Sequence, residues 1–240
     1  MFSRIGPGTI PWLFVDEAGQ AVPQAAAGAI WRSKRAVIVG DPFQIEPVIT
    51  IPEQVVNNIS RYFGLNKTQI QTSLSVQSMA DRANPYGWIT NDTWTGSPLR
   101  VHRRCVDPMF SIANEIAYNG MMHNSTLADN PHLFIQNGFV QVEGKVSGRH
   151  YVPEQGALIR QMIIDEIRQL QDLPDLFVIS PFSEIPSILK KELRQPIKQA
   201  LMVYKQIENN ELQKWLDAHI GTVHTFQGKQ AAGIILCLGL

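Results

Sequence analysis

The chain has 240 residues, 44% of them hydrophobic, which is enough for one large domain or two modest ones. Its 21 basic and 21 acidic side chains cancel, so a nucleic-acid-binding surface must be local. Cys105 and Cys237 lie far apart, which argues against a disulfide framework or a zinc site. No apolar run reaches the roughly 20 residues of a membrane span, and no signal peptide is recognisable, so we expect a cytoplasmic protein that does not contact membranes.

The beginning of the chain predicts a βαβ unit. An apolar run is followed by an Ala-rich, helix-prone segment and then by a second short apolar run that Gly40 stops. The expected strand, helix and strand are at 12–15, 21–31 and 36–39. A strand, a helix and a strand within so short a stretch favour parallel pairing of the two strands.

The later elements alternate between helices and strands. We expect helices at 52–63, 73–83, 108–118, 154–170 and 183–193, and strands at 139–142, 176–180 and 233–238. A loop rich in Asn, Thr, Gly and Trp precedes Pro98 and is the expected domain junction. The pattern predicts an α/β fold, a three-layer α/β/α sandwich with a mainly parallel sheet, in domains at 1–97 and 98–240.

Polar side chains follow the first two predicted strands. Asp16 and Glu17 end the first, and Gln44 lies just past the second. Open α/β sheets bind ligands at the carboxyl ends of their strands, where one carboxylate can hold Mg²⁺ and a neighbour can orient water. The alternatives are a solvated Asp-Glu pair and a Gly-Asp-Pro turn with an exposed glutamine.

Five segments resemble, in family order, the motifs of superfamily 1 DNA/RNA helicases. They are DEAGQA (16–21, like Walker B), GDPFQIEPV (40–48, motif III), LRVHRRCVDPMFSIANEIAYNG (99–120, motif IV), FVISPF (177–182, like VITPY) and GTVHTFQGKQAAGIILCLG (221–239, motif V). The resemblance covers nearly the whole chain. It implies a RecA-like P-loop NTPase fold with a partial first lobe and a nearly complete second lobe.

The resemblance also implies roles for residues at an ATP site. Asp16 would be the Mg²⁺ ligand, Glu17 the base that orients water, and Gln44 the γ-phosphate sensor. Arg104 would reach the γ-phosphate from the second lobe, as a guanidinium can; an ordinary salt bridge is the alternative. Motif IV departs from the family pattern, because Arg-Cys-Val-Asp-Pro replaces Arg-Met-His-Pro with one residue inserted.

Motif V would contact both nucleic acid and nucleotide. The resemblance places Thr222, His224 and Thr225 on the nucleic-acid backbone, although His224 fits a half-buried structural histidine equally well. Gln227 and Gly228 would begin the turn towards the nucleotide. Gln230 stands where the family commonly has Glu, so this contact would lack charge.

The sequence contains no GxxxxGK[ST] phosphate-binding loop. Gly6-Pro7-Gly8-Thr9 matches only its first half and is interpreted as a turn. The helix of motif VI is also missing after the last strand. We therefore expect a fragment truncated before Walker A and after motif V, which alone hydrolyses ATP poorly or not at all.

The parent protein would be a monomeric ATP-dependent helicase. It would couple hydrolysis of ATP, with Mg²⁺, to movement along single-stranded DNA or RNA, which in this branch of the family runs 5′ to 3′. A non-catalytic helicase-like module that binds nucleic acid or protein is the alternative. A related ATPase that remodels protein–nucleic acid complexes without unwinding has the same sequence features.

Overall fold

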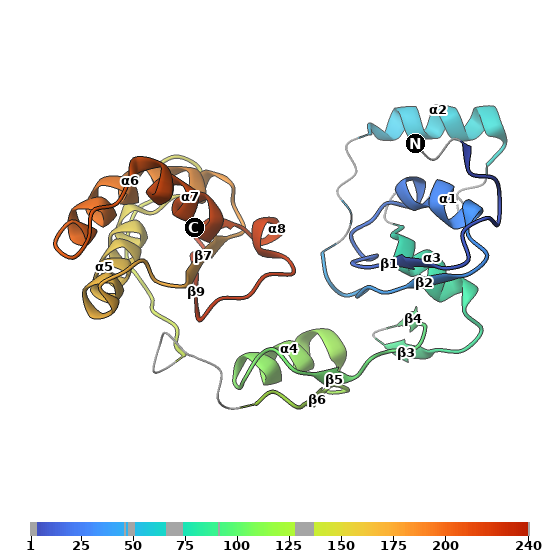
Figure 1. The fold of residues 1–240 in the computed structure, drawn as a ribbon, viewed down its shortest axis with the longest axis horizontal. Coiled ribbons are helices and arrows are strands. Elements are labelled where there is room, and N and C mark those ends of the chain that lie inside the picture. Colours follow the sequence, from blue (N-terminus) through green and yellow to red (C-terminus); the bar gives the residue numbers. More distant parts are fainter. Residues whose placement is uncertain are drawn as a thin grey trace. The chain divides into compact units, whose positions relative to one another are not determined.

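The computed structural model describes residues 4–45, 47, 51–65, 74–90, 92–127 and 137–239. The chain divides into two compact units, Met1–Leu127 and Ala128–Leu240 (Figure 1). Both are mixed α/β with small, mainly parallel sheets, so the α/β class is confirmed. The RecA-like arrangement of two lobes stays a prediction. None of the described helices has the length and apolar character needed to cross a membrane.

The first unit begins with the predicted βαβ unit. Strand β1 (Leu13–Val15) is followed by α1 (Pro23–Arg32) and β2 (Ala36–Ile38), and the two strands pair in parallel. Pro23 begins α1, a position where its missing N–H costs nothing because that group has no partner within the helix. The remaining elements of this unit are α2 (Glu53–Phe63), α3 (Val76–Ala83), β3 (Trp88–Thr90), β4 (Thr93–Thr95), β5 (Val101–His102), α4 (Met109–Tyr118) and β6 (His123–Asn124).

The first unit continues beyond the predicted junction at residue 97. Strands β3 and β4 form an antiparallel hairpin in the segment that we expected to be a loop, and β5 and β6 pair in parallel on either side of α4. The Tyr118 hydroxyl at the end of α4 donates a hydrogen bond to the Asp41 carboxylate. The segment with β5, α4 and β6 therefore belongs to the compact unit that contains β1 and β2.

The second unit contains a three-stranded parallel sheet in the order β8-β7-β9. Its strands are β7 (Leu176–Ser180), β8 (Ile220–Thr222) and β9 (Gly233–Leu236), and its helices are α5 (Pro153–Leu170), α6 (Glu184–Leu201), α7 (Asn209–His219) and α8 (Val223–Phe226). The central strand β7 is almost wholly buried, as a parallel strand covered on both faces should be.

Helix α6 supplies the longest apolar stripe of this core. Fully or almost fully buried side chains recur along one face of the helix, at Ile185, Leu189, Leu193, Ile197 and Leu201. We expected the helix to end at Leu193, before Pro196. It continues because the apolar stripe extends past the proline, and burying that stripe outweighs the one backbone hydrogen bond that a proline removes.

For the second unit one further expectation was wrong, and some of the observed elements were not predicted. Residues 139–142 alternate like a strand but form none, and Phe139 and Val140 are 81% and 66% exposed. Helix α7 and strand β8 were not predicted, although Leu212, Trp215 and Leu216 bury one face of α7. At residues 139–142 and in the α7–β8 segment, packing decides which secondary structure forms. The sequence pattern does not reveal that packing directly.

Candidate functional site

The ends of β1 and β2 lie at the same edge of their sheet. Leu13, Phe14 and Val15 pair with Ala36, Val37 and Ile38, so the residues that follow both strands are neighbours. The loop at Asp16–Gln20 and the loop at Gly40–Gln44 are therefore adjacent. This is the arrangement that the sequence predicted for the two strand ends.

Asp16 and Glu17 lie on an exposed turn directly after β1. One Asp16 carboxylate oxygen, Oδ1, accepts the Glu17 N–H at 2.8 Å, and Glu17 Oε2 accepts from Gln20 Nε2 at 2.9 Å. Glu17 has a φ of 51°, in the left-handed region that few non-glycine residues adopt. Within the described part of the chain neither carboxylate has a basic partner. Both are therefore open to a ligand from solvent.

The two loops approach each other so closely that they exclude side chains between them. A Cβ on Gly19 would lie 2.5 Å from the Asp41 carbonyl oxygen, and one on Gly40 would lie 2.6 Å from the Gly19 nitrogen. The Ala18 N–H also donates to the Val39 carbonyl at 2.9 Å. Glycine is therefore required at both positions, and the two loops form one packed backbone structure.

Asp41 is the centre of the hydrogen bonds in the second loop. Its Oδ1 accepts the Phe43 N–H at 2.9 Å, and its Oδ2 accepts from the Gln44 side-chain amide at 3.1 Å and from the Tyr118 hydroxyl. The Phe43 and Tyr118 rings meet edge to face at 6.0 Å. Burial and the bond to Asp41 raise the pKa of Tyr118, so the hydroxyl keeps its proton. Asp41 thus holds the predicted phosphate sensor Gln44 in place.

Asp41 and Tyr118 had no role predicted from the sequence. The Gly-Asp-Pro sequence suggested a turn, but nothing in it indicated that a tyrosine later in the chain would contact the aspartate. Such a contact depends on how α4 packs on the first unit. The available signal was indirect: Tyr118 ends the apolar helix of the motif IV segment.

Arg104 lies between β5 and α4 and is exposed. It belongs to the same compact unit as Asp16 and Gln44, whereas we expected it in the second domain. Its charge contributes, after burial, to a lowered pKa of His102. Among the described side chains none forms an ion pair with Arg104, so the salt-bridge alternative is not found. No described contact joins it to Asp16, Glu17 or Gln44 either.

We next ask whether the side chains of the chain fit a Mg²⁺ site. In the described ranges no group of three or more His, Cys, Asp or Glu side chains could hold a metal ion. Mg²⁺ in nucleotide enzymes needs only one or two carboxylates, because phosphates and water fill its other positions. The exposed Asp16 carboxylate, with one oxygen bonded only to its neighbour's N–H, fits that limited role.

The predicted nucleic-acid residues lie at the end of β8 and in α8 of the second unit. The Thr222 N–H donates to Thr225 Oγ1 at 3.2 Å, and the two hydroxyl oxygens are 3.4 Å apart. His224 is exposed, so the interpretation as a half-buried histidine is wrong. The structure brings Thr222 and Thr225 together but does not test whether they bind nucleic acid.

The turn after α8 contains the residues that we expected to approach the nucleotide. Gly228 has a φ of 75°, a left-handed conformation that suits glycine, and Gln230 is exposed. The side-chain nitrogen of Gln227 is buried and has no hydrogen-bond partner among the described residues. A buried amide donor without an acceptor is costly.

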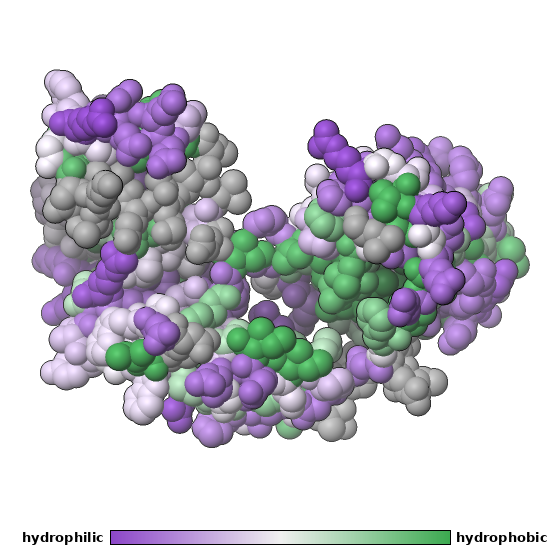
Figure 2. All heavy atoms as spheres, turned by 180° about the vertical axis from the view of Figure 1, so that it is seen from behind, coloured by the Kyte–Doolittle hydropathy of each residue, from purple (hydrophilic) through white to green (hydrophobic). Residues whose placement is uncertain are grey.

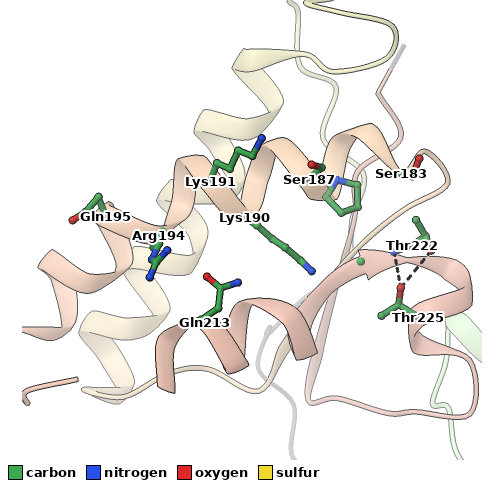
Figure 3. A pocket seen from close by; sticks show the side chains of 11 residues that line it. Ser183, Ser187, Lys190, Lys191, Arg194, Gln195, Gln213, Thr222 and Thr225 are labelled. Atoms are coloured by element: carbon green, nitrogen blue, oxygen red, sulfur yellow. Dashed lines mark hydrogen bonds between the residues drawn. The ribbon is translucent and has the colours of Figure 1, made fainter. Parts of the chain in front are cut away.

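A pocket of about 690 Å³ opens beside Thr222 and Thr225 (Figure 3). One wall is α6, which contributes Lys190, Lys191 and Arg194, and the other walls are α7 and the end of β8. These cations were not predicted as site residues. Their signal was the spacing of Ser187, Lys190 and Arg194, which places these three on one face of a helix.

A larger cavity of about 1420 Å³ lies in the first unit, along β2, α1 and α3. The Gly40–Phe43 segment forms part of its wall, as does the buried pair Gln77 and Asp81. Gln77 Nε2 donates to Asp81 Oδ1 at 2.9 Å, and the Gly96 N–H donates to the same oxygen at 3.0 Å. These bonds connect α3 to the hairpin and stabilise the wall behind the second loop.

Comparisons with known proteins identified no family. A scan against protein-family models and a search of curated proteins both found no match. The resemblance to superfamily 1 helicases therefore rests on the residues of the motifs and on their order.

Proposed function

We propose that the chain is part of an ATP-dependent helicase or translocase of the superfamily 1 type. The observation that carries the proposal is the parallel pairing of β1 with β2, because it brings the Asp16–Gln20 and Gly40–Gln44 loops to one sheet edge. Ligand sites of α/β proteins lie at such edges. Exposed carboxylates on one loop and an oriented amide on the other suit the hydrolysis of a nucleoside triphosphate.

Each residue at this sheet edge would have a separate role in ATP hydrolysis. Asp16 would hold Mg²⁺, which when bound neutralises charge on the phosphates. Glu17, whose carboxylate accepts a hydrogen bond from Gln20, would accept a proton from the attacking water. Gln44, bonded to Asp41, would orient its amide towards the terminal phosphate. Tyr118 would position Asp41.

The phosphate-gripping loop must come from elsewhere. The 240 residues contain no GxxxxGK[ST] sequence, so the proposal requires residues beyond them to cradle the β- and γ-phosphates. The chain alone would then turn over ATP poorly. Single-stranded DNA or RNA would stimulate the ATPase of the longer protein.

A second candidate function is a nucleic-acid-binding module without ATPase activity. It is favoured by Arg104, which no described contact joins to Asp16, Glu17 or Gln44, so the expected catalytic set is not assembled. In that case the carboxylates of the first unit would serve no hydrolytic step. The basic pocket beside β8 would remain the functional surface.

The substitution Glu17→Gln in the full-length protein that contains this chain tests the first candidate. We expect ATP hydrolysis to fall by about a hundredfold or more, because a general base contributes on the order of 10²–10⁴ to a rate. Binding of a fluorescent ATP analogue should be nearly unchanged. Glu53→Gln, an exposed carboxylate of α2, is the matched control.

Two results would overturn the ATPase proposal. Hydrolysis at the wild-type rate by Glu17→Gln would remove Glu17 as the base. A full-length protein that binds single strands but never hydrolyses ATP would instead support the module without ATPase activity.

A further inference from the structure

We propose that the pocket between α6, α7 and β8 binds the phosphodiester backbone of single-stranded nucleic acid, through Lys190, Lys191 and Arg194. This inference rests on the proposed function for its choice of ligand. It adds a binding surface on α6 that lies outside every segment on which the helicase resemblance depends.

The cations come from consecutive turns of α6. Lys190 and Arg194 are one helical turn apart and so share a face, Lys191 follows Lys190 in the chain, and all three line the pocket of about 690 Å³. Figure 3 shows Lys190 and Arg194 extending from α6 towards α7, where Gln213 faces them. The figure also shows Lys191 leaving the helix on another side, at the rim. The pocket thus has two cations inside and one at its edge.

The charge balance of the pocket favours an anion. Its described lining residues include three cations and no carboxylate. The acidic residues of α6 are engaged elsewhere: Glu184 accepts the Arg149 and His150 N–H groups, and Glu192 accepts the Tyr151 hydroxyl. Positive charge on this face is therefore not cancelled by its own helix.

Only one of the three cations has a carboxylate partner in the described part of the chain. Lys190 Nζ is 2.9 Å from Asp217 Oδ1 on α7, and Asp217 also accepts from Gln213 at 3.0 Å. Lys191 and Arg194 form no ion pair with any described residue. These two can bind a phosphate without first breaking an existing ion pair.

Neutral donors complete the opposite wall. The hydroxyl groups of Thr222 and Thr225 line the pocket with the Gln213 amide. Gly221 permits this, because a Cβ there would lie 2.7 Å from the Thr225 side chain. Hydroxyls, amides and cations are the groups that proteins use to contact phosphate oxygens.

The pocket should recognise the backbone and not the bases. None of its described lining residues is aromatic, so it offers no platform on which a base could stack. Phosphate contacts carry no sequence information. We therefore expect binding of single strands of any sequence, and equal affinity for DNA and RNA.

The test measures binding of fluorescein-labelled single-stranded DNA and RNA oligonucleotides to the 240-residue chain by anisotropy over a range of salt concentrations. The double variant Lys191→Glu/Arg194→Glu should bind both at least about tenfold more weakly, since each neutralised phosphate contributes counterion release. Its plot of log affinity against log salt should be shallower, by about 0.7 for each phosphate that the variant no longer neutralises. Both side chains are exposed, so folding should be retained, which circular dichroism can check.

Further variants separate the site from a general charge effect. Lys214→Glu reverses one charge on α7 outside the pocket lining, whereas the double variant reverses two, and its affinity should stay within about twofold of wild type. Asp217→Asn removes the partner of Lys190 and should tighten binding about twofold or more. Lys191→Arg/Arg194→Lys should bind like wild type, because the charge is kept.

The following results would contradict the proposed nucleic-acid site. Equal affinity of the double variant and wild type would overturn it, as would an equal loss in Lys214→Glu. Competition by polyglutamate or inorganic phosphate as effective as by an unlabelled oligonucleotide would show a general anion site. No binding by the wild-type chain would refute the site and the nucleic-acid partner together. Failure of the proposed ATPase is recognised separately, from the Glu17→Gln experiment.

Discussion

The two compact units are stabilised in different ways. The second unit packs α5, α6 and α7 around β7 and shares one cluster of buried aliphatic side chains. The buried cluster of the first unit contains only Ala18, Ala26 and Val76 among the described residues. Its larger apolar side chains reach the surface, Phe14 at 71% and Trp31 at 60% exposure. Figure 2 shows, on one face of the molecule, patches of hydrophobic side chains among hydrophilic ones.

The two units therefore depend on different interactions for their stability. Burial of apolar area, roughly 25 cal/mol per Å², can hold the second unit together. The first unit has two-stranded sheets, which are marginal alone, and relies on hydrogen bonds and close backbone packing. Its specific features are the Asp41 contacts, the Asp81 contacts and the approach of Gly19 to Gly40. The same unit contains the proposed catalytic edge.

The largest expected effect is in the aliphatic core. Leu189→Ala on α6, where the leucine is fully buried, should lower the free energy of unfolding of the second unit by about 2–5 kcal/mol. Hydrogen exchange measured by mass spectrometry should show faster exchange in peptides of the second unit and little change in the first. Leu170→Ala, at a 49% exposed position, is the control and should cost about 1 kcal/mol or less. An equal loss of protection in both units would contradict their separate stabilisation.

An intermediate effect is expected at the polar contact of the first unit. Tyr118→Phe removes the donor to Asp41 and should destabilise the first unit by about 1–2 kcal/mol, as loss of a hydrogen bond to a charged group does. Tyr62→Phe, at an 84% exposed tyrosine, should have no measurable effect. Faster exchange in peptides around Asp41 would support the contact, and unchanged protection there would contradict it.

The same tyrosine predicts a dependence on pH. The pKa of Tyr118 is raised in the folded state, so its contribution to stability is complete below the unfolded pKa of about 10 and is lost as pH rises above that value. Stability of the first unit should therefore decline in alkaline solution more steeply in wild type than in Tyr118→Phe. Phenolate absorbance should show fewer tyrosines titrating near a pH of about 10 in the folded wild type than in the unfolded chain.

The smallest effect is expected at a surface ion pair of the second unit. Lys205 contacts Asp172, and its hydrogen bond is the main cause of the lowered pKa of Asp172. Lys205→Ala should cost only about 0–1 kcal/mol because both side chains are partly exposed. The contribution is present above the unfolded Asp pKa of about 3.9 and is lost as pH falls through the lower folded value. A loss as large as that of Leu189→Ala, measured by urea unfolding, would contradict this ranking.

The sequence predicted elements whose pattern is local. Strand β7 is a continuous apolar run, and α5 has a clear amphipathic period, so both were placed within a residue of their observed ends. The predicted end of α6 was wrong, because the helix and its apolar stripe continue past Pro196 to Leu201. The strand expected at 139–142 has the right alternation but no partner strand among the described residues. Pairing and packing partners are properties of the fold, which a short sequence window does not contain.

The candidate site shows the same limit. Residues at strand ends, such as Asp16 and Gln44, could be predicted because parallel strands bring their carboxyl ends together. The partner of Asp41 could not, because Tyr118 reaches it from a helix far along the chain. The cations of α6 were visible in the sequence, but they became a pocket only when the unpredicted α7 and β8 supplied its other walls. The roles assigned to Glu17, Arg104 and Gln227 stay predictions.

The contact between Gly19 and Gly40 has a mechanical consequence. With backbone against backbone and no flexible side chain between them, neither loop can shift by a few tenths of an ångström without pushing the other. A ligand that displaces the turn at Asp16 and Glu17 therefore also displaces the loop that carries Asp41, and through Tyr118 it pulls on α4. The two glycines and the Asp41–Tyr118 hydrogen bond thus couple one strand end to a helix that comes much later in the chain.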